Sequence, residues 1–380
     1  MKEVGKIKDS CIVIAGQSPK GSSYNDIGEG LEFHQGKKAF GVSVIEHSNV
    51  WTTEITKIAE PGDILMSVRA PVGPTNITDR KICIGRGLAA IRCNSDVIPQ
   101  YILYALRNIE SKIIGNDGAV FNSINKKQIE DLPLPIISFS EQQAIVSRLD
   151  AAFAKIDALK ANAEKQLNDA RALFQAELSE SMMPKEGWEE KILGEVGTFI
   201  RGGNFSKKDF VEKGFPCIHY GQIHTKFGVA TYNHLSCVPS SMVKAERCAS
   251  KGDLVIAITS EDDEGSCKCT AWMADYDAYV GGHTAIFKHI LNPLFVSYYF
   301  KASRFQKAKL EYTHGFKVVE INPKDIAKIS ICYPSLPEQQ QIVAHLDALS
   351  AKVKELEKIN EQTQKECDAL KQAMLREIFE

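Results

Sequence analysis

The sequence predicts a tandem duplicate of a mixed α/β domain, in which each copy is followed by one long α-helix. Two observations support this fold class: a helical stretch occurs twice, and a series of strand-like and loop-like segments occurs twice. The stretch EQQAIVSRLDAAFAKIDAL begins at Glu141, and EQQQIVAHLDALSAKVKEL begins at Glu338, at an offset of 197 residues. Since the offset holds without a gap along both helices, we expect the two copies to have the same local structure.

The two helical stretches have the pattern of a coiled coil. In heptads, eight of ten seam positions in each copy are apolar or thiol side chains, which favours pairing of long helices. We expect the two helices to pair with each other as an intramolecular antiparallel coiled coil related by pseudo-twofold symmetry, roughly 64 Å long at 1.5 Å per residue. The predicted seam residues are Ile145, Leu149, Ile156, Leu159, Leu173, Ile342, Leu346, Val353, Leu356 and Leu370.

The segments before each helix also match. Pro61-Gly62-Asp63 leads into an apolar run, and Lys251-Gly252-Asp253 does the same in the second copy. A proline that is typical of a helix start follows later in each copy, at Pro99 and at Pro293. We therefore predict a first domain at 1–140, a central helix at 141–184, a second domain at 185–337 and a C-terminal helix at 338–380.

Composition is that of an ordinary globular protein, with 44% hydrophobic and 25% charged residues. No run of about 18 apolar residues is present, and the first residues do not resemble a signal peptide. The ten cysteines are scattered, which favours reduced thiols over a disulfide framework. We therefore expect a cytoplasmic protein that makes no membrane contact. The net charge is −2, but the helices are acidic and the domains slightly basic, so each domain can have a basic face.

No motif predicts chemistry in this chain. Residues 292–295 (Asn-Pro-Leu-Phe) lack the second proline of the amino-methyltransferase motif and are better explained as a helix start. Cys267, Cys269 and His283 do not have the spacing of a common zinc site. The acidic residues 261–264 have no counterpart in the first domain and are expected in a solvated or DNA-adjacent loop. We therefore predict no catalytic, cofactor-binding or metal-binding residues.

The chain resembles the specificity (S) subunits of type I restriction–modification systems. The resemblance rests on the duplicated SxxEQQxIVxxLD pattern, on residues 36–41 (GKKAFG) and 69–73 (RAPVG), and on residues 216–223 (PCIHYGQI). It covers essentially the whole chain. The duplicated helix motif is specific, whereas the domain motifs are less so because the family diversifies them.

The resemblance implies a function in phage defence. Each domain would be a target recognition domain that reads one half of a bipartite, asymmetric DNA sequence. The helices would set the gap between the halves and dock two copies of an adenine-N6 methyltransferase subunit, and motor–nuclease subunits can join. The S subunit would perform no chemistry, and S-adenosylmethionine would bind to the methyltransferase partner.

Candidate base-reading residues follow from the donors and acceptors that base edges require. Arg69 is the strongest candidate, because it follows a predicted strand on a loop stiffened by Pro and Gly. The other candidates are Gln35, Lys37, Lys38 and Asn76 in the first domain, and His219, Tyr220, Gln222, His224, Lys226 and Ser260 in the second. The predicted phosphate contacts, which set affinity and salt dependence, are Lys207, Lys208, Lys268 and Lys317.

Two alternatives stay open at this stage. A coiled-coil adaptor whose domains bind proteins rather than DNA would show the same duplication, but no salt-dependent affinity for DNA. A specificity subunit of a related system, in which the methyltransferase and the nuclease are fused in one partner, would have the same motifs.

Overall fold

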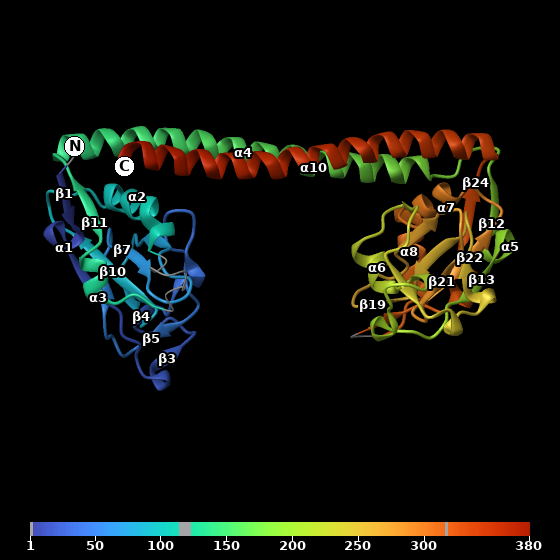
Figure 1. Ribbon diagram of the computed structural model, residues 1–380, viewed down its shortest axis with the longest axis horizontal. Coiled ribbons are helices and arrows are strands. Elements are labelled where there is room, and N and C mark those ends of the chain that lie inside the picture. The colour runs from blue at the N-terminus through green and yellow to red at the C-terminus, as the bar shows by residue number, and fades with distance from the viewer. Residues whose placement is uncertain (1–2, 114–122, 316–317) are drawn as a thin grey trace. The chain divides into compact units, whose positions relative to one another are not determined.

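A computed structural model of the protein describes residues 3–113, 123–315 and 318–380. The chain forms two compact units, one made of Met1–Ala163 with Asn360–Glu380 and the other of Glu164–Ile359. Each unit contains one α/β domain and a segment of each of the two long helices, α4 (Phe139–Ser181) and α10 (Leu336–Phe379) (Figure 1).

Unit 1 contains two small sheets and a two-stranded ribbon. The first sheet is antiparallel in the order β2-β10-β7-β8, and the second has the order β3-β5-β4-β9-β6 with β4 and β9 parallel. The ribbon pairs β1 with β11. The strands are β1 (Glu3–Lys6), β2 (Cys11–Ala15), β3 (Tyr24–Asn25), β4 (Leu31–His34), β5 (Trp51–Thr52), β6 (Ile58–Ala59), β7 (Ile64–Ser67), β8 (Thr75–Ile77), β9 (Ile82–Ile84), β10 (Leu88–Cys93) and β11 (Pro133–Ile136). The helices are α1 (Ile7–Ser10), η1 (Gly21–Ser23), η2 (Lys37–Ala39), α2 (Pro99–Ile109), η3 (Glu110–Lys112) and α3 (Lys126–Glu130).

Unit 2 repeats this plan with additions. Its first sheet has the order β13-β22-β18-β20-β15, its second has the order β16-β14-β21-β17 with β14 and β21 parallel, and its ribbons pair β12 with β24 and β19 with β23. The strands are β12 (Glu189–Ile192), β13 (Gly197–Arg201), β14 (Phe215–Ile218), β15 (Ala230–Thr231), β16 (Ser236–Val238), β17 (Cys248–Ala249), β18 (Leu254–Ala257), β19 (Thr259–Ser260), β20 (Cys269–Trp272), β21 (Ala278–Val280), β22 (Thr284–His289), β23 (Val319–Glu320) and β24 (Ser330–Tyr333). The helices are α5 (Leu193–Val196), η4 (Lys207–Asp209), α6 (Tyr220–Thr225), η5 (Ser240–Met242), η6 (Ala245–Arg247), α7 (Pro293–Tyr299), α8 (Ser303–Ala308), η7 (Lys309–Tyr312) and α9 (Pro323–Ile326).

The duplicated glycine turns begin equivalent central strands. Gly62 precedes β7 with a φ of 90°, and Gly252 precedes β18 with a φ of 97°; other residues adopt these values at a cost. The next side chain, Asp63 or Asp253, accepts a hydrogen bond of 2.8 Å from the main-chain N–H three residues earlier. The repeated turn therefore has the same structure in both copies.

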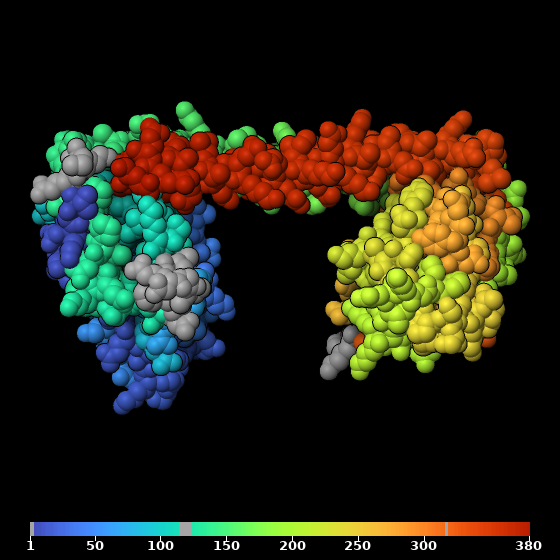
Figure 2. Space-filling view, viewed as in Figure 1, coloured from blue at the N-terminus to red at the C-terminus, as the bar shows by residue number. Residues whose placement is uncertain are grey.

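The two long helices run antiparallel within each unit. In unit 1, Lys160 pairs with Asp368 at 2.8 Å, and in unit 2, Arg171 pairs with Glu357 at 2.6 Å. In the space-filling view, the helical segment of each unit packs directly on the domain of that unit (Figure 2). The expected fold class, a duplicated mixed α/β domain with two long helices, is confirmed.

The predicted seam needs one correction. Leu149, Ile156 and Leu346 are buried, and Ile145, Ile342, Val353 and Leu356 are half-buried. In contrast, Leu159, Leu173 and Leu370 are 55%, 65% and 50% exposed and lie outside the seam.

One row of the seam lies one residue later in the chain than predicted. Phe153, Leu167 and half-buried Phe174 occupy it on α4, and Lys371 takes the place of Leu370 on α10 with its ammonium 5.3 Å from the centre of the Phe153 ring. Side chains on a helix lean toward its N-terminus, so a given surface is covered by a residue about one position further along. The larger aromatic rings also bury more area than the alternative residues would.

Two equivalent glutamines join the long helices to the domains. Gln142, the second residue of the EQQ motif, is 5% exposed and accepts a hydrogen bond of 2.9 Å from the main-chain N–H of Ile98 before α2. Gln339 is 1% exposed and accepts one of 2.9 Å from Asn292 before α7. The duplicated motif thus serves attachment of the domain as well as helix pairing.

A tyrosine and an aspartate repeat the same attachment about two turns further along α4 and α10. The hydroxyl of Tyr104 on α2 donates to the carboxylate of Asp150 on α4, and the hydroxyl of Tyr298 on α7 donates to Asp347 on α10 at 2.6 Å. Burial, together with the neighbouring carboxylate, raises the pKa of Tyr104 to about 12. Both tyrosines therefore remain protonated donors at physiological pH.

Candidate functional site

Three loops of unit 1 converge at the carboxyl ends of the parallel strands β4 and β9. The loop after β2 contains Gln17, whose N–H donates to Ile84 at 3.0 Å. The loop after β9 contains Gly85 and Gly87, whose N–H groups donate to the carbonyls of His34 at 2.8 Å and Gln35 at 3.1 Å. A Cβ at Gly87 would lie 2.3 Å from the Gln35 carbonyl, so the glycine is required for this close approach.

The same convergence occurs in unit 2, at the carboxyl ends of β14 and β21. Gly203, in the loop after β13, donates to the Val280 carbonyl at 2.6 Å, and Gly281 donates to that of Ile218 at 2.9 Å. Phe33 pairs with Cys83 in the parallel strands of unit 1, and Cys217 pairs with Tyr279 in those of unit 2. Phe33 therefore corresponds to Cys217, and Cys83 corresponds to Tyr279. The segments that begin at Gln35 and at His219 are therefore topologically equivalent.

A fourth segment adjoins this cluster in each unit. Val68 N–H donates to the Gly87 carbonyl at 3.0 Å, and Ile258 N–H donates to that of His283 at 3.0 Å. The next residues, exposed Arg69 and half-buried Thr259, lie at equivalent positions beside the two loop clusters. Hence the strongest base-reading candidate of the first domain has a threonine as its counterpart in the second.

The remaining candidates of the first domain divide into two groups. Gln35, Lys37 and Lys38 are exposed on the segment after β4. Asn76 is fully buried on β8, and its side-chain amide donates to the Gly41 carbonyl at 2.8 Å. The prediction for Asn76 is therefore contradicted by its position, because a buried side chain that bonds to a neighbouring loop cannot meet a base edge.

Two candidates of the second domain are used in capping α6. His219 Nδ1 accepts from the Gly221 N–H at 3.2 Å, and burial lowers the pKa of His219. The Gln222 amide accepts from the His219 N–H at 2.9 Å and donates to Ser236 at 2.9 Å. Both side chains hold the loop in place, and they leave little hydrogen-bonding capacity for a base.

The other candidates of the second domain lie nearer the surface. Tyr220 and His224 are half-buried, and a ring nitrogen of His224 lies 3.2 Å from the Thr259 carbonyl. Lys226 is exposed, and Ser260 is half-buried on β19. These candidates of the second domain therefore lie near the loop cluster, but their side chains differ in exposure.

The predicted phosphate-binding lysines are free to contact a ligand where the structure describes them. Lys207 and Lys208 are exposed on η4, which follows the loop after β13, and Lys268 is exposed directly before β20. Lys317 lies outside the described residues. Lys207 and Lys208 therefore adjoin the loop cluster of unit 2.

Sequence reasoning missed Arg86 in the first domain. Arg86 is exposed between the two close-packed glycines Gly85 and Gly87 and projects from the loop cluster. The similarity of residues 85–91 to residues 281–286 could have indicated it. In the first copy Arg86 lies between two glycines, and in the second copy His283 follows two glycines.

A buried ionic network supports the loop cluster of unit 1. Glu32 on β4 accepts two hydrogen bonds of 2.8 Å from Arg80, one from His34 at 2.8 Å and one from the Ser48 N–H at 2.6 Å. Burial by itself would raise the pKa of Glu32, but the hydrogen bonds from these partners hold that pKa at about 2. Arg80 also donates to the carbonyls of residues 45 and 46, so the network fixes residues 45–48 beside β4.

The described part of the chain has neither a cluster of metal-binding side chains nor a helix that could cross a membrane. In residues 3–113, 123–315 and 318–380, no three His, Cys, Asp or Glu side chains gather as a metal site would require. Within the same residues, none of the helices has an apolar stretch that would suffice to span a bilayer.

Comparison with known proteins gives a consistent result. A family model for the type I restriction modification DNA specificity domain matches residues 3–169 and again residues 185–365. The putative type I restriction enzyme MjaX specificity subunit of Methanocaldococcus jannaschii is 42% identical over 162 residues, which are 42% of this chain and 37% of that protein. The type I restriction enzyme EcoKI specificity subunit of Escherichia coli is 25% identical over 174 residues, again 37% of its length. These alignments span little more than a third of each curated relative.

Solved structures share the fold over nearly the whole chain. A chain from a study of complex assembly and conformational transition of the type I R-M system superposes with a TM-score of 0.78 at 19% identity, covering 99% of this chain and 97% of that one. The HsdS subunit from Thermoanaerobacter tengcongensis superposes with a TM-score of 0.57 at 19% identity, covering 99% and 96%.

Two α/β domains with equivalent loop clusters and two shared long helices define a duplicated protein with one candidate binding face per domain. The chain belongs to the family of type I restriction modification DNA specificity domains and contains two copies of that domain. The resemblance inferred from the sequence motifs is thereby confirmed.

Proposed function

We propose that this chain is the DNA-specificity subunit of a type I restriction–modification complex in a bacterial or archaeal cytoplasm. Each domain reads one half of a bipartite, asymmetric DNA target through the loop cluster at the carboxyl ends of β4 and β9, or of β14 and β21. The chain performs no chemistry itself. The observation that carries the proposal is the twofold match to the DNA specificity domain, with the two matches on domains that place equivalent loops together.

The exposed side chains of the loop clusters support DNA as the ligand. Gln35 and Arg69 in the first domain have the amide and the guanidinium that pair with adenine and guanine edges. Lys37 and Lys38, which were predicted to read bases, and Arg86 give the first cluster cations that can contact base edges or phosphate groups. Lys207 and Lys208 give the second cluster cations for phosphate groups. An adaptor that binds proteins would have no need for this combination.

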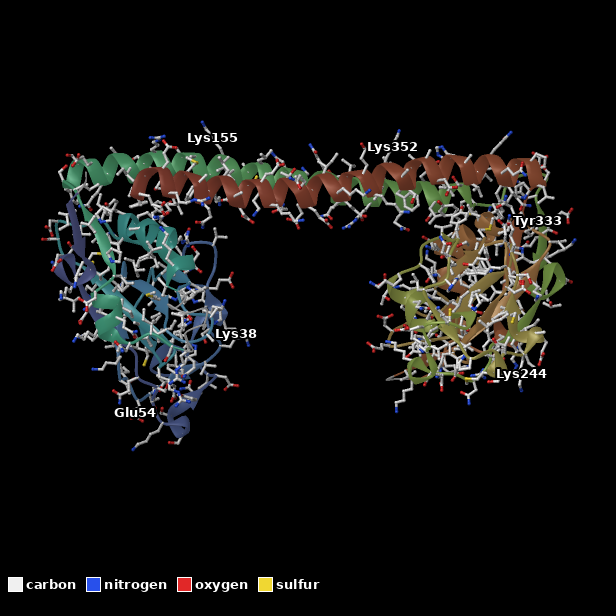
Figure 3. All side chains as sticks on the ribbon, in the orientation of Figure 1. Lys38, Glu54, Lys155, Lys244, Tyr333 and Lys352 are labelled. Carbon is white, nitrogen blue, oxygen red and sulfur yellow. The ribbon has the colours of Figure 1, made fainter. Side chains whose placement is uncertain are left out.

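The long helices are the proposed docking site for two adenine-N6 methyltransferase subunits. Lys155 on α4 and Lys352 on α10 occupy equivalent positions of the duplicated motif, and each projects from the face turned away from the domain of its own unit (Figure 3). Both lysines are exposed. S-adenosylmethionine binds to the methyltransferase subunits, and motor–nuclease subunits join the complex for cleavage.

Sequencing of modified bases tests the proposal directly. A strain that carries this gene should have N6-methyladenine in a gapped, asymmetric motif, and deletion of the gene should remove that methylation. Persistence of the motif after deletion, in a strain without a second specificity gene, would contradict the proposal. Absence of salt-dependent DNA affinity in the assembled complex would favour the protein-binding adaptor instead.

Changing the length of the helices tests their role as a spacer. Addition of matched turns to α4 and α10 near the boundary of the two units should change the number of bases in the gap and leave both half-sequences intact. A changed half-sequence would show that the helices do more than separate the domains.

A further inference from the structure

Unit 1 has a cavity of about 990 Å³ at its loop cluster. Segments after β2, β4 and β9 surround it, and its lining includes Ser18, Gln35, Gly36, Asn49 and Arg86. The Gln35 amide oxygen accepts from the Ser18 hydroxyl at 2.9 Å, which orients the amide at the cavity wall. A pocket of this size that is partly open to solvent can receive a group as large as a nucleotide.

The lining combines three kinds of group that a nucleotide requires. Tyr24 stacks on Phe33 with ring centroids 4.9 Å apart and an interplanar angle of 24°, which gives an aromatic wall. Gln35 and Asn49 provide amides that match the edges of bases. Arg86 and Lys38 are exposed lining residues, and Glu46 also lines the pocket. Within the described residues, neither cation forms an ion pair with a carboxylate.

The equivalent position in unit 2 is filled by rings. Gly36 of the first domain corresponds to Tyr220, as the register of the parallel strands shows. The Tyr220 ring lies 4.5 Å from the His219 ring and 5.2 Å from the His283 ring. At this position the first domain therefore has a glycine that lines an open pocket, whereas the second domain has a tyrosine that packs beside two imidazole rings.

We propose that the cavity of the first domain receives one nucleobase swung out of the DNA duplex, while the second domain reads bases that remain paired. The inference rests on the proposed function, which supplies DNA as the ligand. The displaced base would lie beside the aromatic wall with its edge toward Gln35 and Asn49, and Arg86 and Lys38 would bind the adjacent phosphates. Loss of pairing and stacking opposes this step, and contacts in the pocket offset that loss.

Binding to mismatched duplexes tests the inference. The full chain, assembled with its methyltransferase partner, is titrated with target duplexes that keep the recognised strand and change the opposite base at one position at a time. A base that leaves the duplex leaves more readily when it is unpaired, and the methyltransferase extrudes its own target adenine in the same way. Apart from the methylated adenines, one position of the first half-site should therefore bind about tenfold more tightly when mismatched. No position of the second half-site other than its methylated adenine should gain affinity.

Filling the cavity should remove this gain. Gly36→Tyr places in the first domain the ring that the second domain has, and the site accepts it, because a Cβ there meets no atom within 4 Å and the backbone is extended with a φ of −168°. Gly21→Tyr is the matched control, since its Cβ also meets nothing within 4 Å and Gly21 does not line the cavity. The mismatch gain should persist in Gly21→Tyr and be lost in Gly36→Tyr.

The outcomes separate this inference from the proposed function. Arg86→Ala leaves the cavity open and should reduce the gain in affinity for the mismatched duplex several-fold. This second variant is a control for a folding defect in Gly36→Tyr. A gain that survives Gly36→Tyr, or no gain at any position other than the methylated adenines while sequence-specific binding is intact, would overturn the inference alone. Lack of any sequence preference in the wild-type complex would overturn the proposed function and the inference with it.

Discussion

The two copies of the domain agree where they meet the long helices and differ where their loops converge. Gln142 and Gln339 make the same hydrogen bond to the chain before α2 or α7. At the other end of the domains, Gly36 and Tyr220 occupy equivalent positions, yet one lines a cavity and the other packs in a ring cluster. Attachment was therefore retained after duplication while the candidate recognition surface diverged, as expected if the two faces bind different sequences.

The largest expected effect concerns the shared helical attachment. Leu149→Ala should lower the free energy of unfolding by about 2–5 kcal/mol, because Leu149 is fully buried and its removal leaves a cavity. Leu159→Ala should change it by only about 0.5 kcal/mol or less, because Leu159 is 55% exposed. Urea unfolding of both variants checks the corrected seam, and equal losses would restore the predicted one.

The next effect should occur in the first domain alone. The pKa of Glu32 is held at about 2, below its ordinary value of 4.5, so its network stabilises the fold above pH 4.5 and this contribution is lost as the pH falls toward 2. Glu32→Gln should therefore cost about 3 kcal/mol near neutral pH and less near pH 2. Denaturant unfolding at several pH values measures this, with exposed Glu29→Gln as the control.

The position equivalent to Glu32 in the second domain is Pro216, which cannot titrate. The loss of stability that Glu32 causes between pH 4.5 and 2 should therefore be confined to the first domain, and Glu32→Gln should leave the acid unfolding of the second domain unchanged. An altered acid unfolding of the second domain in this variant would show that the effect of Glu32 is not confined to the first.

A smaller effect should distinguish the two recognition faces. Arg69→Ala should weaken binding to the proposed target by about 1–3 kcal/mol and relax one base of one half-site. Binding to a panel of single-base target variants measures this, and Thr259→Ala at the equivalent position of the second domain provides the comparison. An equal loss on every sequence would mean that Arg69 contacts phosphate.

The smallest effect should be the contribution of the lysines beside the second loop cluster. Lys207→Ala and Lys208→Ala should each reduce the slope of log affinity against log salt concentration by about 1, without changing the preferred sequence. Titrations at several salt concentrations measure the slope. A changed preference at one base would reassign either lysine to base reading.

The features predicted well from the sequence are those that repeat. Duplicated helices, the Gly62 and Gly252 turns and the matching segments around them needed only comparison of one half with the other. One row of seam residues was predicted one position too early in the chain. Ala152 and Phe153 both lie three or four residues from Leu149 and from Ile156, so either can follow the helical spacing. Side-chain direction and ring size decided between them, and neither is evident from the apolar pattern.

The contacts and exposure of individual candidate side chains were harder to predict than the strands and loops that contain them. Polar residues after β14 were expected to read bases, but His219 and Gln222 have donors and acceptors that also satisfy the first turn of α6. Asn76 has the chemistry for adenine and yet is buried, because its position on β8 faces the interior. Arg86 was missed since its importance depends on three loops that meet only in the folded domain.

The composition of unit 1 has a consequence for the order in which the protein acquires its structure. Residues Asn360–Glu380 belong to this unit, and Leu375 and Cys367 are buried there in a cluster with Tyr104 and Phe153. The domain of unit 1 is therefore synthesised before that of unit 2, yet it completes its packing only after residues 360–380 have also been synthesised. Such contacts between distant parts of a sequence slow folding, so the domain of unit 1 should depend longer than that of unit 2 on protection from aggregation during synthesis.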